Sequence, residues 1–174
     1  MKIIAFGGSN SQHSINKHLA TYAAGLFESA EGEVLDLNDF AMPLFSVDLE
    51  KEVGQHEKAK AFLDKLESAD VLVVSLAENN NNYSTAFKNI FDWSSRINKE
   101  VFQQKPMLLM ATSPGTRGGA SVLEIARNAL PRYGANVKAT FSLPAFNANY
   151  DLEKNQISNT ELDTELKGLI KECF

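Results

Sequence analysis

The chain has 174 residues, of which 44% are hydrophobic and 22% charged, a size and composition typical of one globular domain. The net charge is −5 and no basic cluster occurs, so we expect no nucleic-acid partner. No apolar run approaches the ~20 residues of a membrane span, no signal peptide opens the sequence, and the single cysteine, Cys173, can form no internal disulfide. We therefore expect a cytoplasmic protein with no membrane partner and no metal.

Apolar runs typical of buried strands alternate along the chain with apolar residues at helical spacing. The strands are expected at 2–6, 33–37, 69–77, 105–113 and 136–143, and the helices at about 14–29, 55–68, 84–102, 120–133 and 160–172. The connection over residues 38–54 reads as irregular. Because it is longer than a compact domain usually spends on a linker, we expect it to line a site.

Five strands alternating with helices imply right-handed crossovers onto one parallel sheet, with helices on both faces. We expect residues 1–174 to form a single α/β domain of this kind. Ligands of such sheets bind beyond the carboxyl ends of the strands, near the switch point in strand order. With the order 2-1-3-4-5, the loops at 7–16, 77–83 and 113–119 would meet there.

The first of these loops has the composition of a phosphate site. Gly7 and Gly8 allow a tight exit from the strand and a close approach by a ligand. Ser9, Ser11, Ser14 and Asn16 supply hydroxyl and amide groups, and the start of the next helix supplies free N–H groups and a positive dipole end. The alternative is that Ser14 merely caps this helix while the other polar side chains face water.

Better-known phosphate motifs do not match this sequence. It has neither the G-x-G-x-x-G of dinucleotide folds nor the G-x-x-x-x-G-K-S of NTPases. A phospho-receiver domain needs an aspartate at the end of the third strand, where this chain has Ser75-Leu76-Ala77.

The second loop, "AENNNNY", offers one carboxylate, four amides and an aromatic ring, which suit a planar heterocycle with donors and acceptors. Alternatively it is a polar turn that caps the following helix, in which Phe87, Phe91 and Trp93 are core or subunit-interface residues.

The third loop, "TSPGTRGGAS", has three glycines, and Arg117 could either reach a phosphate or carboxylate or remain solvated. His13, His18 and His56 have no evident acid, base or nucleophile partner, so we expect them at the surface.

Taken together, the three loops resemble the NADPH-dependent FMN reductase family of flavodoxin-like proteins, over residues 1 to about 137. The family pattern G-S-x-R-x-x-S-x-N is matched by Gly8-Ser9, Ser14 and Asn16. The pattern P-E-Y-N-x-S-x-P-G-x-L-K-N-x-x-D-W is matched by Glu78, Asn80, Lys88, Asn89, Asp92 and Trp93. S-P-G-x-x-G-G occurs unchanged at 113–119.

This resemblance implies a flavodoxin-like three-layer sandwich that binds FMN. The phosphate would lie on Ser9, Ser11, Ser14, Ile15 and Asn16. The ribityl and isoalloxazine parts would meet Ala77, Glu78, Asn79, Asn80, Asn81 and Tyr83, and the ring would lie beside Ser113, Pro114, Gly115, Gly118 and Gly119.

The family reaction passes a hydride from NADPH or NADH to FMN and then electrons to a quinone, a second flavin or a similar small acceptor, with no catalytic side chain. The resemblance also implies a homodimer or homotetramer with contacts through the helix at 84–102. Two alternatives remain at this stage: a flavodoxin-type electron carrier, and a structural relative impaired in flavin binding.

The chain departs from the family pattern near the expected cofactor. Ser11 replaces the arginine of the first motif, for which His13, Lys17 or Arg117 could compensate in part. Ala77 and Asn79 replace the proline and tyrosine of the second motif, and Ser84-Thr85 replace Pro-Gly. We therefore expect FMN to bind more weakly than is usual for the family.

Overall fold

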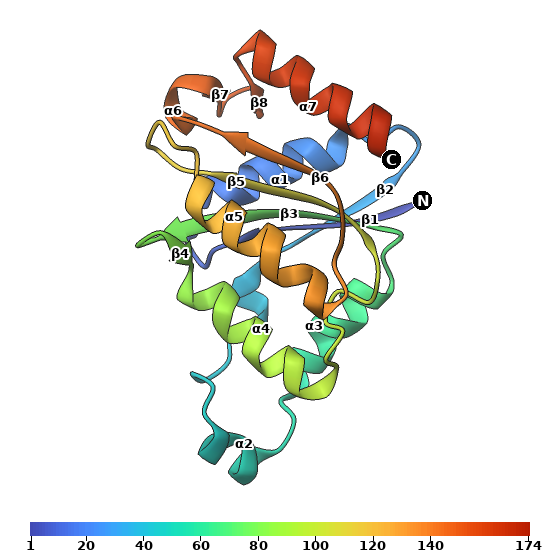
Figure 1. The fold of residues 1–174 in the computed structure, drawn as a ribbon, viewed down its shortest axis with the longest axis vertical. Coiled ribbons are helices and arrows are strands. Elements are labelled where there is room, and N and C mark those ends of the chain that lie inside the picture. The colour runs from blue at the N-terminus through green and yellow to red at the C-terminus, as the bar shows by residue number, and fades with distance from the viewer.

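A twisted central sheet organises the computed structural model, which describes all of residues 1–174 (Figure 1). Its strands are β1 (Lys2–Gly8), β2 (Glu31–Leu35), β3 (Val71–Asn79), β4 (Asn82–Tyr83), β5 (Pro106–Thr112) and β6 (Asn136–Leu143). The five long strands are parallel in the order β2-β1-β3-β5-β6, and the two-residue β4 pairs antiparallel with β3. The short strand β4 was not predicted from the sequence. When only the five long strands are counted along the chain, their order in the sheet is 2-1-3-4-5, as predicted.

Helices cover both faces of the sheet. The α-helices are α1 (Ile15–Gly25), α2 (Val47–Val53), α3 (Glu57–Glu67), α4 (Thr85–Ile97), α5 (Ala120–Ala129), α6 (Phe146–Asn149) and α7 (Thr160–Cys173). Short 3-10 turns η1 (Leu37–Phe40) and η2 (Leu130–Tyr133) and a hairpin of β7 (Tyr150–Asp151) and β8 (Gln156–Ile157) complete the fold. In Figure 1, α1 and α7 lie above the sheet and α3, α4 and α5 below it.

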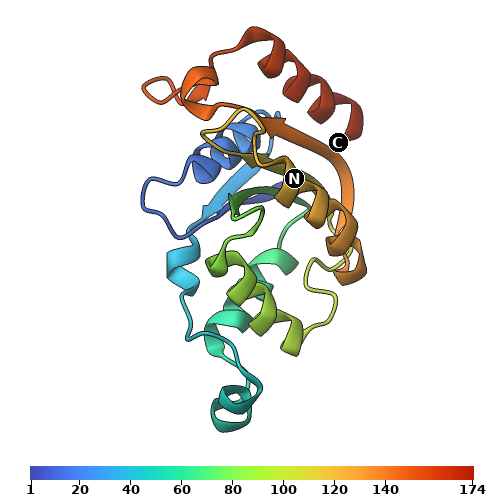
Figure 2. The ribbon, with the colours of Figure 1, turned by 60° about the vertical axis from the view of Figure 1, so that its left-hand side comes forward.

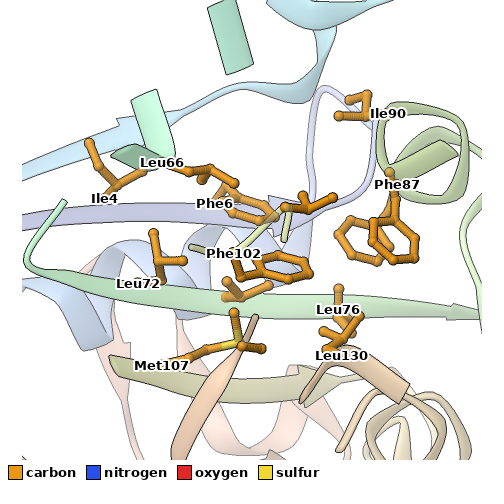
Figure 3. Close-up of a cluster of buried hydrophobic side chains, with 14 of the residues drawn as sticks. Ile4, Phe6, Leu66, Leu72, Leu76, Phe87, Ile90, Phe102, Met107 and Leu130 are labelled. Carbon is orange, nitrogen blue, oxygen red and sulfur yellow. The ribbon is translucent and has the colours of Figure 1, made fainter. Parts of the chain in front are cut away.

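Alternate strand residues supply the two hydrophobic cores. Ile4, Phe6 and Leu72 face the layer of α3, α4 and α5 (Figure 3), whereas Ile3 and Ala5 face α1 and α7. Central parallel strands covered on both faces have continuous apolar sequences, which is why the sequence pattern located them. None of the helices is both long enough and apolar enough to span a bilayer.

Phe87, Phe91 and Trp93 belong to the interior of the protomer. Each is less than a tenth exposed, and Trp93 is 1% exposed. Core packing therefore accounts for all three, and the alternative that they form an exposed subunit interface is not supported.

Residues 41–56 form a strap that carries α2 away from the body of the molecule (Figures 1 and 2). The prediction of an irregular connection is wrong at two places, because the connection contains η1 and α2. Ser46 caps α2 by accepting a hydrogen bond from the Leu49 N–H, but no residue of this helix is buried. A short helix without a buried face leaves no apolar periodicity in the sequence.

Candidate functional site

The loops that follow β1, β3 and β5 meet beyond the carboxyl ends of these strands, as predicted. They enclose a groove of about 190 Å³ lined by Ser9, Ser11, His13, Ser14, Ile15, Asn16, Ala77, Glu78, Asn79, Thr112, Ser113 and Pro114. The groove thus combines the predicted residues of the first loop with Ala77, Glu78, Asn79, Ser113 and Pro114. Thr112 was not predicted here, and His13 was expected at the surface, with a possible part in replacing the missing arginine. The position of Thr112 at the end of a strand beside the third loop was the signal that could have found it.

Gly7 determines how closely α1 approaches the sheet. A Cβ atom at this position would lie 2.4 Å from the backbone nitrogen of Lys17, so only glycine permits the observed contact. The close packing brings the first turn of α1 against the end of β1, where Ser14, Ile15 and Asn16 line the groove. The sequence signal at Gly7 therefore reports on helix packing rather than on direct contact with a ligand.

The start of α1 presents donors to this groove. The Ser14 hydroxyl caps the helix by accepting a hydrogen bond from the Lys17 N–H at 3.1 Å. The N–H groups of Ile15 and Asn16 have no acceptor within the helix. Ser9 and Ser11 shape the preceding loop by accepting backbone bonds, and their hydroxyl hydrogens remain able to donate. Ser14 is thus a helix cap, and the helix start still offers free donors to a ligand.

The Asn16 side chain is a buried clamp between strands. Its Oδ1 accepts from the Ser75 hydroxyl at 2.8 Å and from the Thr112 N–H at 3.0 Å, and its Nδ2 donates to the Thr112 carbonyl at 3.1 Å. The residue is 2% exposed. Its amide therefore holds β3 and β5 against α1, and its backbone N–H remains available to a ligand.

The Glu78 carboxylate lies at the N-terminus of α5, the second helix that begins beside the groove. Its Oε2 accepts from the Val122 N–H, in the first turn of α5, at 3.0 Å. A carboxylate at this place is stabilised by the helix dipole and fills the position that another anion would take. Of the two helix starts beside the groove, that of α1 alone is therefore open to an anion.

The run of asparagines forms a tight hairpin between β3 and β4. Asn80 and Asn81 both have positive φ, at 50° and 61°, as in a type I′ turn, and both are exposed. The structure does not bring Asn80, Asn81 or Tyr83 to the groove. The Tyr83 hydroxyl is buried without a hydrogen-bond partner, and burial raises the pKa of this phenol to about 12.

The loop at 113–119 contributes its first residues to the groove and folds its glycines away. Gly118 and Gly119 are buried with φ of 58° and 76°. A Cβ atom at Gly118 would lie 2.3 Å from the Ser142 hydroxyl oxygen, so close packing on β6 explains this glycine. Gly115 is exposed and lies outside the groove lining.

A second cavity of about 410 Å³ adjoins the groove and shares Asn79 with it. It is enclosed by the 37–44 segment, the first turns of α4 and Asn10. The strap is tied to α4 here, because the Trp93 Nε1–H donates to the Pro43 carbonyl at 2.8 Å and the Asn89 amide bonds Met42 and Phe45. The connection predicted to line a site thus lines this cavity.

No group of three or more His, Cys, Asp or Glu side chains is placed to hold a metal ion. Nor does a titratable side chain in the groove have a partner arranged for acid–base catalysis: Glu78 bonds the start of α5, and the His13 ring makes no hydrogen bond within the protein. The chemistry that this groove supports is binding and orientation of an anionic ligand.

Comparisons with known proteins identify the family. A family model described as NADPH-dependent FMN reductase matches residues 1–148. The NADH-dependent flavin reductase subunit 2 of Lactobacillus johnsonii is 29% identical over 143 residues, which cover 79% of this chain and 74% of that protein. The 2-hydroxy-1,4-benzoquinone reductase of a Burkholderia species is 33% identical over 122 residues, which cover 69% of this chain and 64% of that enzyme.

Solved structures show the same fold. FerB, an NAD(P)H:(acceptor) oxidoreductase from Paracoccus denitrificans, superposes with a TM-score of 0.76 at 24% identity, covering 98% of this chain and 93% of its own. The apo form of the NADH:FMN oxidoreductase EMOB gives 0.75 at 21% identity, covering 98% and 87%. The predicted resemblance is confirmed: the chain belongs to the NADPH-dependent FMN reductase family and is an FMN-dependent NAD(P)H oxidoreductase with a flavodoxin-like fold.

Proposed function

We propose that FMN binds with its phosphate at the start of α1, its ribityl chain along Ala77–Asn79 and its ring beside Ser113–Gly115. The observation that carries this assignment is the pair of helix starts beside the groove. That of α5 holds the Glu78 carboxylate, whereas that of α1 offers the N–H groups of Ile15 and Asn16 to an anion.

The residues present fit the phosphate end of the cofactor. Ser9, Ser11 and Ser14 line the same groove as the free N–H groups, and hydroxyl donors suit phosphate oxygens. A volume of about 190 Å³ is smaller than the ~300–1,000 Å³ of most small-molecule pockets, so the groove holds the phosphate and part of the ribityl chain. The ring then lies at the open side, where reductant and acceptor have access to it.

When bound, FMN supplies the redox chemistry, taking electrons from NADPH or NADH and passing them to an acceptor such as a quinone or a flavin. The chain's own residues bind and orient. The loop at 9–16 holds the phosphate, and the Asn16 clamp fixes that loop against β3 and β5. No side chain is proposed to move a proton.

We further propose that residues 1–174 act as one domain in the cytoplasm, on small molecules rather than on nucleic acid or a membrane, and as a homodimer or homotetramer. Exposed apolar side chains of the strap, Leu44, Val47 and Val53, support assembly with another copy. Sedimentation velocity tests this part of the proposal. A monomer at micromolar concentration would contradict the assembly but not the flavin chemistry.

Two measurements test the proposed function. Titration with FMN is expected to quench flavin fluorescence with saturation at micromolar protein. Anaerobic stopped-flow mixing of the loaded protein with NADPH or NADH is expected to bleach the flavin, and an added quinone to restore its absorbance. Absence of FMN binding would contradict the proposed cofactor site. Binding of FMN without bleaching by either nucleotide would indicate an electron carrier instead of a reductase.

A further inference from the structure

The groove lacks a strong cation where a phosphate dianion is proposed to lie. Ser11 stands in place of the arginine of the family pattern, and three nearby side chains could supply the missing charge: His13, Lys17 and Arg117. The structure distinguishes among them by where each side chain is engaged.

Lys17 and Arg117 are both committed elsewhere. The Lys17 Nζ lies 2.6 Å from Asp36 Oδ2, and this hydrogen bond holds the pKa of Asp36 below its usual range. The Arg117 guanidinium donates to the Ser121 hydroxyl, one turn along the chain. Neither side chain lines the groove.

His13 remains. It lies in the groove lining, it is exposed, and its ring makes no hydrogen bond within the protein. Among the lining residues it is the one side chain that can carry a positive charge. Its backbone is fixed beside the α1 start, because its N–H donates to the Ser11 hydroxyl at 3.3 Å. Glu78, the acidic residue of the lining, is held by the Val122 N–H of α5.

We propose that His13 supplies the cationic part of phosphate recognition in this protein, by donating from its ring to the FMN phosphate, and so adds to the preference for FMN over riboflavin given by the start of α1. This inference rests on the proposed flavin site. It assigns to His13 the part that the family pattern gives to an arginine two residues earlier. Because one imidazole replaces a guanidinium, this side chain adds less to the preference for FMN over riboflavin than the arginine of the family pattern would.

The experiment compares the binding of FMN and riboflavin, followed by flavin fluorescence at about 0.1 M salt, in the wild type and three variants. His13→Gln keeps a polar side chain but removes the charge. His13→Lys restores a cation. His18→Gln is the matched control, because His18 lies on α1 outside the groove lining.

His13→Gln is expected to weaken FMN binding about fivefold, because a neutral amide forms a weaker hydrogen bond to a phosphate than a charged ring does, and to leave riboflavin binding unchanged. His13→Lys is expected to recover most of the FMN affinity, and His18→Gln to match the wild type. Unchanged FMN binding in His13→Gln, or an equal loss for both flavins, would overturn the role of His13. A wild type that binds neither flavin would instead refute the underlying site.

Discussion

Replacing Asn16 by alanine tests whether the α1–β3–β5 clamp holds the site together. The change removes all three side-chain hydrogen bonds, to the Ser75 hydroxyl and to the Thr112 N–H and carbonyl. Ser75 and Thr112 are at most 1% exposed, so the change leaves buried polar groups without their side-chain partner. An intramolecular hydrogen bond contributes about 0.5–1.5 kcal/mol, and a buried group left without a partner costs about 1–3 kcal/mol.

We therefore expect the Asn16→Ala variant to lose about 3 kcal/mol of unfolding free energy without any flavin present. For a domain of this size that corresponds to a fall in Tm of roughly 6–12 °C. Urea denaturation of the flavin-free protein, followed by circular dichroism, measures the loss. Asn10→Ala is the control, because Asn10 is exposed and its side chain bonds nothing, so its unfolding free energy should stay within about 0.5 kcal/mol of wild type. A loss below about 1 kcal/mol for Asn16→Ala would refute the clamp and return Asn16 to the role of a direct ligand.

Further predictions concern stability and its pH dependence. Gly118→Ala should lower the free energy of unfolding in urea by about 2 kcal/mol or more, because the φ of Gly118 is 58° and a Cβ atom there would collide with Ser142. Gly168 lies on α7 with open space around it, so Gly168→Ala should raise the free energy of unfolding by up to ~1 kcal/mol. A loss of stability in Gly168→Ala would contradict this expectation. Tyr83→Phe should maintain or raise stability at pH 7, since it removes a buried hydroxyl without a partner. Burial raises the pKa of Tyr83 to about 12, whereas in the unfolded chain this phenol ionises near pH 10. The free energy of unfolding is therefore unaffected by Tyr83 ionisation below about pH 10 and falls as the pH rises toward 12; urea midpoints that fall equally in wild type and Tyr83→Phe over this range would refute the assignment. The hydrogen bond from Lys17 lowers the pKa of Asp36, so this ion pair contributes to the free energy of unfolding above about pH 4, and the contribution is lost as the pH falls further. Lys17→Met should therefore make the urea midpoint depend less on pH in the acid range. An unchanged dependence would exclude this ion pair as its source.

The strand order and the meeting of three loops could be predicted because both follow from local signals. Continuous apolar runs indicate buried parallel strands, and alternation with helices constrains the topology. The site then follows from the rule that ligands bind beyond the carboxyl ends of strands at a switch point. For that reason, the three loops that line the groove could be identified from the sequence.

Individual side-chain roles were less predictable. The partners of Asn16 lie 59 and 96 residues away, so no local pattern reveals the clamp. Asn80 and Asn81 have the composition of a ligand-binding loop, but asparagine also tolerates positive φ, which makes it a common residue of tight hairpins. Gly118 resembled a ligand contact because the sequence cannot show that β6 packs against it.

The most direct test of the account is a crystal structure of the protein with FMN bound. The phosphate is expected at the start of α1, within hydrogen-bonding distance of the Ile15 and Asn16 N–H groups, with the Glu78 carboxylate still on the Val122 N–H of α5. A phosphate bound at the start of α5, or an FMN molecule placed outside the groove between the β1, β3 and β5 loops, would contradict it.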